Sequence, residues 1–396
     1  MNRLTSATTF ALLAALGCTS EVPLGDGTGG TAGAQTGGSG GAAAGAGGTA
    51  AAGGSAGSSG GAAGAGGTAG GGGSSGSAGS GGAATCVPTA VTGALTELVG
   101  DAAGLYAVAE SGDTLYYAVA STKAATTLGS VKKDGTGQSK VYGSGDAPGY
   151  VPTVLETDAT HLYWLAGGVQ SHAYRRPLVG GPAEAINVNP IVGGSTALAA
   201  TSNSVFWANG STVYASPKSS PSPQVAYAVT PGRMTGISMA SNGDDVVWVE
   251  WIDPNETIAT EHILRKGSEK LAPAQTVLSF PTFHPTSVAV DATDVYYAQG
   301  GKGVSRIALT GGSPTTLHQG EIVSHISMDA TNVYFLENAG DCRTLMAVPK
   351  AGGAAVALAT GLPGSASGLE QGNNLDVDAT DVFVGTFAGK IFKVSK

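Results

Sequence analysis

The strongest constraint on the fold is a short segment that recurs four times along the chain. It reads Asp-Ala-Thr, then a polar, an aliphatic and an aromatic residue, and it begins at Asp158, Asp291, Asp329 and Asp378. An aspartate that starts a turn accepts the backbone N–H two residues on, and threonine does so more weakly. We therefore expect these segments to be tight turns between strands, and the chain to be built from repeated β-hairpins.

Pairs of large, mostly aromatic residues in the strand after the turn give the period of the repeat. Their second members are between 38 and 49 residues apart, and the seven pairs are Tyr116-Tyr117, Tyr163-Trp164, Phe206-Trp207, Val247-Trp248, Tyr296-Tyr297, Tyr334-Phe335 and Phe383-Val384. This spacing is typical of a propeller blade, and one unit reads as four short strands with alternating hydrophobicity. The sequence therefore predicts an all-β domain over residues 86–396, a seven-bladed β-propeller with four-stranded blades.

The two ends of this domain complement each other. The last repeat, from Asn374 to Lys396, stops after its third strand, whereas residues 89–100 look like a fourth strand with no partner of their own. We expect this N-terminal strand to complete the last blade and to close the ring. Such closure removes two exposed sheet edges, which would otherwise favour aggregation.

The chain before residue 86 has a different composition. Residues 1–18 carry one cation, Arg3, and an apolar run of about a dozen residues, which is the length of a secretory signal and too short to span a bilayer. The segment ends in Leu-Gly-Cys and resembles a bacterial lipoprotein signal, which implies lipidation at Cys18. Ordinary cleavage nearby is the alternative.

Residues 19–85 are almost entirely Gly, Ala, Ser and Thr. They lack the large apolar side chains that offset the entropy of folding, so we expect a disordered tether. Together with the signal, this predicts an exported protein: an outer-membrane lipoprotein, at the cell surface or on the periplasmic side, that meets the membrane only through its lipid.

The charge balance limits the partners. The chain has 19 Lys and Arg against 28 Asp and Glu, a net charge of -9. Nucleic-acid recognition depends on clustered Lys and Arg, so we expect no nucleic-acid partner. We expect a monomer that binds a protein or carbohydrate ligand on a loop face.

Three segments of the repeat carry a family resemblance. The strings LYWLAGG, VFWANG and VYYAQGG resemble the YWTD and NHL-type propellers, and also the propeller lipoproteins that bacteria secrete with glycine-rich tethers. The resemblance covers about 300 residues and implies the propeller fold. No repeat has the complete Tyr-Trp-Thr-Asp string, and the third and fourth repeats lack the Asp-Ala-Thr turn.

The turn aspartates also allow a functional interpretation. Our first interpretation is structural, but a ring of carboxylates at one mouth of the central channel is an alternative, and it would bind Ca²⁺ or Mg²⁺. The candidate ligands are Glu156 with Asp158 and Asp376 with Asp378, because one member of each pair belongs to an expected innermost strand.

The histidines suggest a second alternative, a metal-dependent enzyme of the lyase or lactonase type. His284, His325 and Glu321 are the candidate catalytic residues, because they precede or lie in the innermost strands of adjacent repeats. Residues 86–396 contain no His-Glu-x-x-His, Gly-x-Ser-x-Gly or phosphate-binding loop motif, and the glycine-rich strings of the tether are of low complexity. A binding or scaffolding module is therefore favoured over an enzyme.

The remaining candidate residues are the tryptophans, for the core or for ligand binding, and two cysteines, for a disulfide. Three tryptophans hold a fixed place in the repeat and are expected in the core, whereas Trp251 and its neighbour Glu250 lie beside an insertion and are candidates for ligand binding. Export permits a disulfide between Cys86 and Cys342. Cys342 is expected on the face of the ring opposite the start of the closing strand, so the sequence leaves this bond open.

Overall fold

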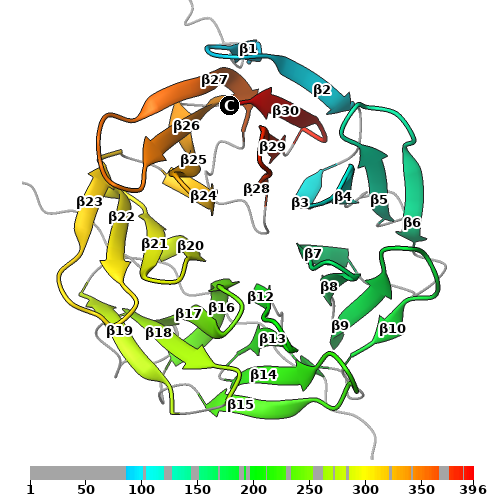
Figure 1. Cartoon of the computed structure of the whole chain (residues 1–396), viewed down its shortest axis with the longest axis vertical. Helices are drawn as coiled ribbons and strands as arrows, with labels where there is room; N and C mark the ends of the chain where they lie inside the picture. Colours follow the sequence, from blue (N-terminus) through cyan, green and yellow to red (C-terminus); the bar gives the residue numbers. More distant parts are fainter. Residues whose placement is uncertain are drawn as a thin grey trace, which may run out of the picture. The chain divides into compact units, whose positions relative to one another are not determined.

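The computed structural model describes a ring of antiparallel sheets. The residues that it describes are 86–396 apart from 101–103, 120–126, 144–150, 168–169, 187–190, 193–196, 211, 229–232, 253–261, 271–272, 282–284, 321–322, 340–341, 365–373 and 387. Within them the strands form seven sheets around a central axis (Figure 1). The predicted all-β, seven-bladed propeller is confirmed.

Each blade begins with an innermost strand and ends at the rim (Figure 1). Blade one consists of β3 (Leu105–Ser111), β4 (Thr114–Val119), β5 (Thr127–Lys132) and β6 (Ser139–Gly143). Blade two consists of β7 (Val151–Thr157), β8 (His161–Gly167), β9 (Gln170–Pro177) and β10 (Glu184–Ala185), and β11 (Ile191–Val192) also pairs with β9. Blade three consists of β12 (Ala197–Ala200), β13 (Ser204–Asn209), β14 (Thr212–Pro217) and β15 (Gln224–Ala228).

The remaining blades follow the same plan. Blade four consists of β16 (Arg233–Ser241), β17 (Asp245–Ile252), β18 (His262–Ser268) and β19 (Gln275–Phe280). Blade five consists of β20 (Pro285–Val290), β21 (Asp294–Gln299), β22 (Gly303–Ala308) and β23 (Thr315–His318). Blade six contains β24 (Val323–Met328), β25 (Asn332–Ala339), β26 (Cys342–Pro349) and β27 (Val356–Pro363), and blade seven contains β28 (Leu375–Val377), β29 (Asp381–Gly385) and β30 (Ile391–Ser395).

The ring closes where the first and last described strands meet. β2 (Leu95–Val99) pairs antiparallel with β30 and completes blade seven, as predicted. The predicted strand over residues 89–100 is nevertheless two strands, because β1 (Thr89–Ala90) pairs with β27 as a fifth strand of blade six. Gly93 lies between them with a φ of 65°, and a Cβ there would lie 2.7 Å from the carbonyl oxygen of Ser395. Only glycine fits where the chain crosses between the two blades.

A disulfide bond joins Cys86 to Cys342, with their Cα atoms 5.6 Å apart. The sequence left this bond open because the two cysteines were expected on opposite faces. β1 resolves the difficulty: it runs antiparallel along β27, whose last residue, Pro363, pairs with Cys342. The entering chain therefore starts on the face where β26 begins. Stable disulfides are typical of proteins outside the cytoplasm.

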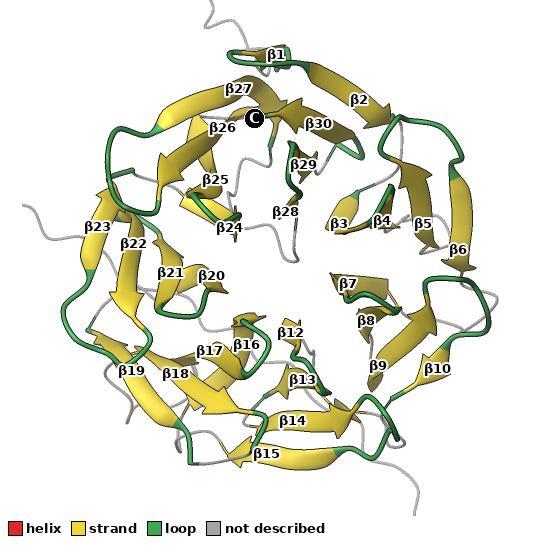
Figure 2. Cartoon of the chain, viewed as in Figure 1, coloured by secondary structure: helices red, strands yellow, loops and turns green. Residues whose placement is uncertain are grey.

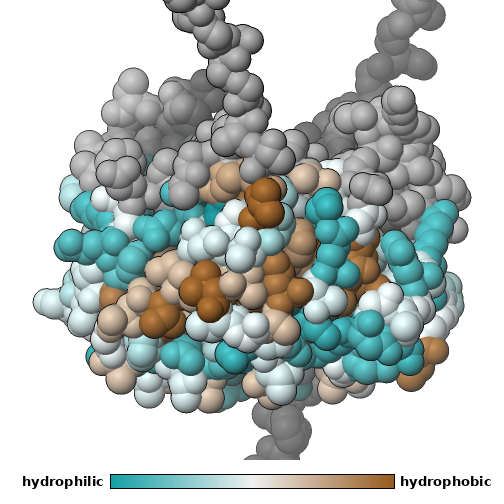
Figure 3. Space-filling view, turned by 90° about the horizontal axis from the view of Figure 1, so that it is seen from above, coloured by the Kyte–Doolittle hydropathy of each residue, from teal (hydrophilic) through white to brown (hydrophobic). Residues whose placement is uncertain are grey.

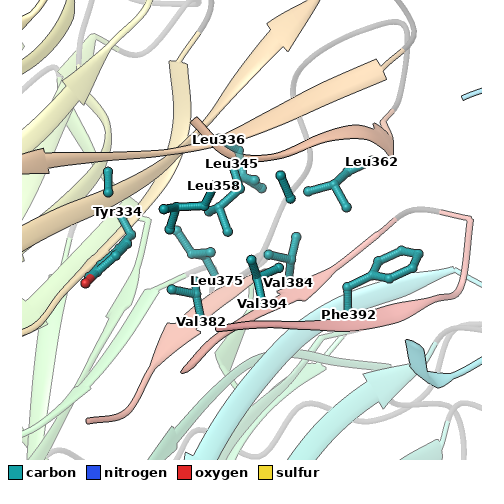
Figure 4. Close-up of a cluster of buried hydrophobic side chains, with 12 residues drawn as sticks. Tyr334, Leu336, Leu345, Leu358, Leu362, Leu375, Val382, Val384, Phe392 and Val394 are labelled. Carbon is teal, nitrogen blue, oxygen red and sulfur yellow. The ribbon is translucent and has the colours of Figure 1, made fainter. Parts of the chain in front are cut away.

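The core lies between neighbouring blades. Trp164, Trp207 and Trp248 are at most 1% exposed, which confirms their predicted place in the core. Between blades six and seven, side chains from both sheets pack into one cluster of twelve buried residues, which includes Leu358 and Val384 (Figure 4). Burial of each large apolar side chain stabilises the fold by roughly 1.5–3 kcal/mol.

The short turns that follow the first and third strands of the blades lie on one face of the ring, which we call the turn face (Figure 2). The expected signal, Cys18 and the tether of residues 19–85 lie outside the described residues, and so does most of the insertion after Trp251. Across the described part of the chain, no helix is long and apolar enough to cross a membrane.

Candidate functional site

The Asp-Ala-Thr segments are turns stabilised by their aspartates. In blade two, Oδ1 of Asp158 accepts hydrogen bonds from the backbone N–H of Thr160 at 2.7 Å and of His161 at 2.8 Å. The same two bonds recur in blades five, six and seven, at Asp291, Asp329 and Asp378. This confirms the structural interpretation of the repeated segment.

The second carboxylate oxygen of each turn aspartate binds a lysine from the next blade. We call these ion pairs the lysine latches, and their Nζ–Oδ2 distances are 2.7 Å for Lys218–Asp158, 3.0 Å for Lys350–Asp291, 2.6 Å for Lys396–Asp329 and 2.5 Å for Lys133–Asp378. Each Nζ also lies 5.0–5.3 Å from the centre of an aromatic ring that follows the turn, a favourable cation–π distance. The latches therefore tie one blade to the next on the turn face.

The latches shift the ionisation of their aspartates. Burial opposes the ionisation of Asp158, but the hydrogen bonds from Lys218 and from the turn N–H groups outweigh it and hold the pKa of this carboxyl well below its usual range. The pKa values of Asp291 and Asp329 are lowered in the same way. These carboxylates stay ionised and engaged throughout the neutral range.

The latch lysines were not among the residues predicted from the sequence. Their signal is a lysine directly after the third strand, in the strings VKK, SPK, VPK and VSK. The other three joints between neighbouring blades have no latch. Their lysine position holds Leu178, Glu269 and Leu309. The turn position that faces it holds Ser111, Thr201 and Asn242. Aspartate and lysine are thus present together or absent together at every joint.

Carboxylates also occur on three of the innermost strands. The residue that pairs with the first member of each large-residue pair is small in five blades: Ala109, Ala199, Ala240, Ala289 and Ser327. In blades two and seven it is Glu156 and Asp376. With Glu110 of β3, in the blade between them, we call these residues the axial carboxylates.

Hydrogen bonds join the axial carboxylates to the latch between blades seven and one. Oδ2 of Asp376 accepts the backbone N–H of Glu110 at 2.7 Å. Oε2 of Glu110 lies 2.8 Å from Nζ of Lys133, which also binds Asp378. One lysine therefore pairs with two carboxylates, and Glu156 makes no ion pair with a described residue.

The pKa values of two axial carboxyls are raised. Burial raises the pKa of Glu156 to about 8, and the negative charge of Asp376 adds to the rise. Burial also raises the pKa of Asp376 to about 7, although the N–H groups of Glu110 and Val377 favour its ionised form. Blades two and seven are not neighbours, so this repulsion acts across blade one, near the axis.

The structure does not gather the predicted metal ligands into one site. Asp158 and Asp378 belong to latches, while Glu156 and Asp376 are axial carboxylates. Among the residues described, no three His, Cys, Asp or Glu side chains converge closely enough to hold a metal ion. The Ca²⁺ or Mg²⁺ site remains a prediction.

The candidate catalytic residues are only partly within the described chain. His284 and Glu321 lie outside it. His325 lies at a bulge in β24, is 8% exposed and has a φ of 44°. It is the one residue other than glycine with a positive φ in the described chain.

The candidate binding residues of blade four lie in β17. Trp251 is half-buried, and Glu250 is only 1% exposed. Oε1 of Glu250 lies 3.2 Å from Nε of Arg265 in the neighbouring strand. Glu250 therefore serves an ion pair within the blade and is not an open surface group.

An open pocket of about 440 Å³ lies on the turn face over the joint between blades seven and one. Both blades contribute charged side chains of both signs to it, including Lys132, Lys133, Lys393, Asp113, Asp378 and Asp381. This pocket and the axial carboxylates share the latch of Lys133 and Asp378. The candidate site is therefore on the side of the ring where the chain closes on itself.

The fold has counterparts among solved structures. The structure of YCF48 bound to a D1 peptide has a TM-score of 0.53 at 10% identity, over 80% of this chain and 99% of that chain. The computationally designed Ika8 protein has a TM-score of 0.49 at 12% identity, over 76% and 98%. The nidogen/laminin complex has a TM-score of 0.44 at 12% identity, over 56% of this chain and 85% of that chain. No protein-family model and no curated protein matches the sequence.

Proposed function

We propose that this protein is an envelope-anchored binding module that captures a ligand with a cationic group at the axial carboxylates. The observation that carries this proposal is the placement of Glu156 and Asp376 at a repeat position that is otherwise Ala or Ser. Five blades are built without a carboxylate there, so the fold does not require one. Glu156 and Asp376 are both half-buried. Removing a carboxylate from water is costly, and groups with strongly perturbed pKa values gather at functional sites.

The charge of the cluster indicates the chemistry of the ligand. The repulsion between Glu156 and Asp376 raises the pKa of Glu156. An ammonium or guanidinium group between the two carboxylates would relieve that repulsion. The mixed charges of the adjacent pocket suit a peptide, which carries both signs. YCF48 has been solved with a bound D1 peptide, so peptides are the first ligand class to test.

Binding is tested by isothermal titration calorimetry of the full chain with a trilysine peptide at pH 8. We expect the double variant Glu156→Gln, Asp376→Asn to bind at least tenfold more weakly. Glu184→Gln removes an exposed carboxylate at the rim and should leave the affinity unchanged. Equal affinities of the wild-type protein and the double variant, or equal binding of a triglutamate peptide, would contradict the proposal.

The proposed anchor rests on the lipoprotein-type signal that ends at Cys18 and on the glycine-rich residues 19–85. The disulfide between Cys86 and Cys342 supports a place outside the cytoplasm. Labelling with a palmitate analogue in a bacterial host tests the anchor. We expect the label and the membrane association to be lost in Cys18→Ser and kept in the matched variant Ser20→Ala. Membrane association of Cys18→Ser would exclude the lipid anchor.

A further inference from the structure

A charged residue also interrupts the repeat at the joint between blades one and two. In each third strand, one residue pairs with the aliphatic residue that precedes the large pair. In six blades this residue is small or aliphatic and buried: Val131, Ser216, Gly267, Ile307, Val348 and Val394. In blade two it is Arg176, which pairs with Leu162. A position of the inter-blade core has thus become cationic in one blade.

No carboxylate of the described residues forms an ion pair with Arg176. Its Nη1 donates to the carbonyl oxygen of Val141 at 2.6 Å. Its Nε is buried and has no hydrogen-bond partner in the part of the chain that the structure describes. A half-buried guanidinium without a counter-charge is unfavourable, and a bound anion would supply that charge.

The surroundings of Arg176 are rich in hydrogen-bond donors. The side chain lines a pocket of about 160 Å³ between the two blades, together with Tyr116, Ser130, Ser139 and Lys140. The hydroxyl oxygens of Ser130 and Ser139 are 2.9 Å apart, so they already face each other. Burial raises the pKa of Tyr116, whose hydroxyl therefore remains a donor at neutral pH. None of the described residues that line this pocket is Asp or Glu.

We propose that this pocket binds a small oxyanion, either a carboxylate or a phosphate-like group. The planar guanidinium presents several N–H donors to such an anion, while Lys140 adds a second positive charge at the pocket. The pocket is separate from the axial carboxylates, and it would bind an anion whereas they would bind a cation. It therefore extends the proposed function instead of resting on it.

The joint between blades one and two is one of the three that lack a lysine latch. Leu178 holds the lysine position and lines the pocket, while Ser111 replaces the turn aspartate. The two positions that hold Asp and Lys at a latched joint therefore bring no carboxylate to this one.

The test measures the melting temperature of the full chain in acetate, phosphate, sulfate or chloride at constant ionic strength and pH 7. When the anion concentration is about ten times the dissociation constant, binding should raise the melting temperature by about 2–4 °C above the value in chloride. A rise in acetate alone identifies a carboxylate site, whereas a rise in phosphate and sulfate identifies a phosphate-like site. No rise above chloride with any of the three would overturn the proposal.

Two variants separate binding from folding. Arg176→Leu places an aliphatic residue at the repeat position, so we expect an unchanged or higher melting temperature in chloride and no further rise with the anion. Arg306→Leu, on the third strand of blade five, is the matched control and should keep the full rise. If Arg176→Leu does not fold, Arg176→Lys keeps the charge without the planar group and should weaken the anion at least fivefold in calorimetry. A rise that persists unchanged in either Arg176 variant would assign the anion to another site.

Discussion

The seven joints between blades form two groups, four with a lysine latch and three without. At the unlatched joints, Leu178 and Leu309 hold the lysine position, while Glu269 accepts hydrogen bonds from the backbone and side-chain nitrogens of Asn203. At the latched joints, the lysine side chains are only 13–17% exposed. The comparison shows that the turn aspartate has two roles, to stabilise its own turn and to neutralise a half-buried cation from the next blade.

The largest expected effect is the loss of one partner of a latch. Asp329→Ala removes the hydrogen bonds that the carboxylate accepts from Thr331, Asn332 and Tyr334 and leaves Lys396 without its carboxylate, so we expect the free energy of unfolding to fall by about 3 kcal/mol. Thr201→Ala, at the corresponding position of an unlatched joint, should cost about 1 kcal/mol. Denaturant unfolding at pH 7 measures both values. Equal losses would mean that the latches add nothing to the turns.

A double-mutant cycle tests whether each latch acts as a unit. Replacing Asp291 by Ser and Lys350 by Leu copies the joint between blades one and two. We expect the double variant to lose about 2 kcal/mol less than the sum of the two single variants, because neither partner is left alone. Additive losses would contradict this coupling.

The latch aspartates and Glu156 should respond to pH in opposite directions. The latch aspartates have lowered pKa values, so the unfolded chain binds more protons in acid, and the stability that they contribute is lost as the pH falls below about 4. Glu156 has its pKa raised from 4.5 to about 8, so the folded chain binds the extra proton, and stability falls as the pH rises between these values.

Glu156→Gln isolates the second response. It removes the charge but keeps the shape, so we expect the variant to be about 1 kcal/mol more stable than the wild-type protein at pH 8.5 and equal to it at pH 4.5. Thermal unfolding across this range measures the difference. A constant difference at all pH values would show that the carboxyl does not titrate as described.

The smallest expected effect is the gain of a latch at the joint between blades four and five. Oδ1 of Asn242 already accepts the backbone N–H groups of Asp244 at 3.2 Å and Asp245 at 2.9 Å, as a turn aspartate does. Asn242→Asp loses the hydrogen bond that Nδ2 donates to the carbonyl oxygen of Asp291, and this loss offsets the new ion pair. With Leu309→Lys it should therefore change stability by only about 0.5 kcal/mol, whereas Leu309→Lys alone should cost about 2 kcal/mol. Equal stabilities of the single and double variants in denaturant unfolding would contradict the pairing rule.

The fold was predictable because its signals are local. The turn segments, the period of the large-residue pairs and the missing last strand all appear within short stretches of sequence. The pairing of β1 with β27 was not predictable, because Thr89 and Ala90 are too few to show an alternating pattern. The disulfide could not be predicted either, because it depends on this pairing of β1 with β27.

The candidate site was only partly predictable. Strand alternation singled out Glu156 and Asp376, but as metal ligands, since their mutual repulsion across blade one appears only in three dimensions. The latch lysines lie in a different blade from their aspartates, 245 residues away in the case of Lys133 and Asp378. Arg176 stands out only when the third strands are aligned by their pairing with the second strands.

The disulfide also decides how the ring bears mechanical load. A pull on the chain before Cys86 passes through a covalent bond into β26, the middle strand of the five-stranded sheet of blade six. β1 and the closing strand β2 follow Cys86 and are bypassed by that force. Without the bond, the same pull would peel off the two residues of β1 and then the five residues of β2, one hydrogen bond at a time. Oxidation of these two cysteines thus shields the pairing of β2 with β30, which closes the ring, from tension.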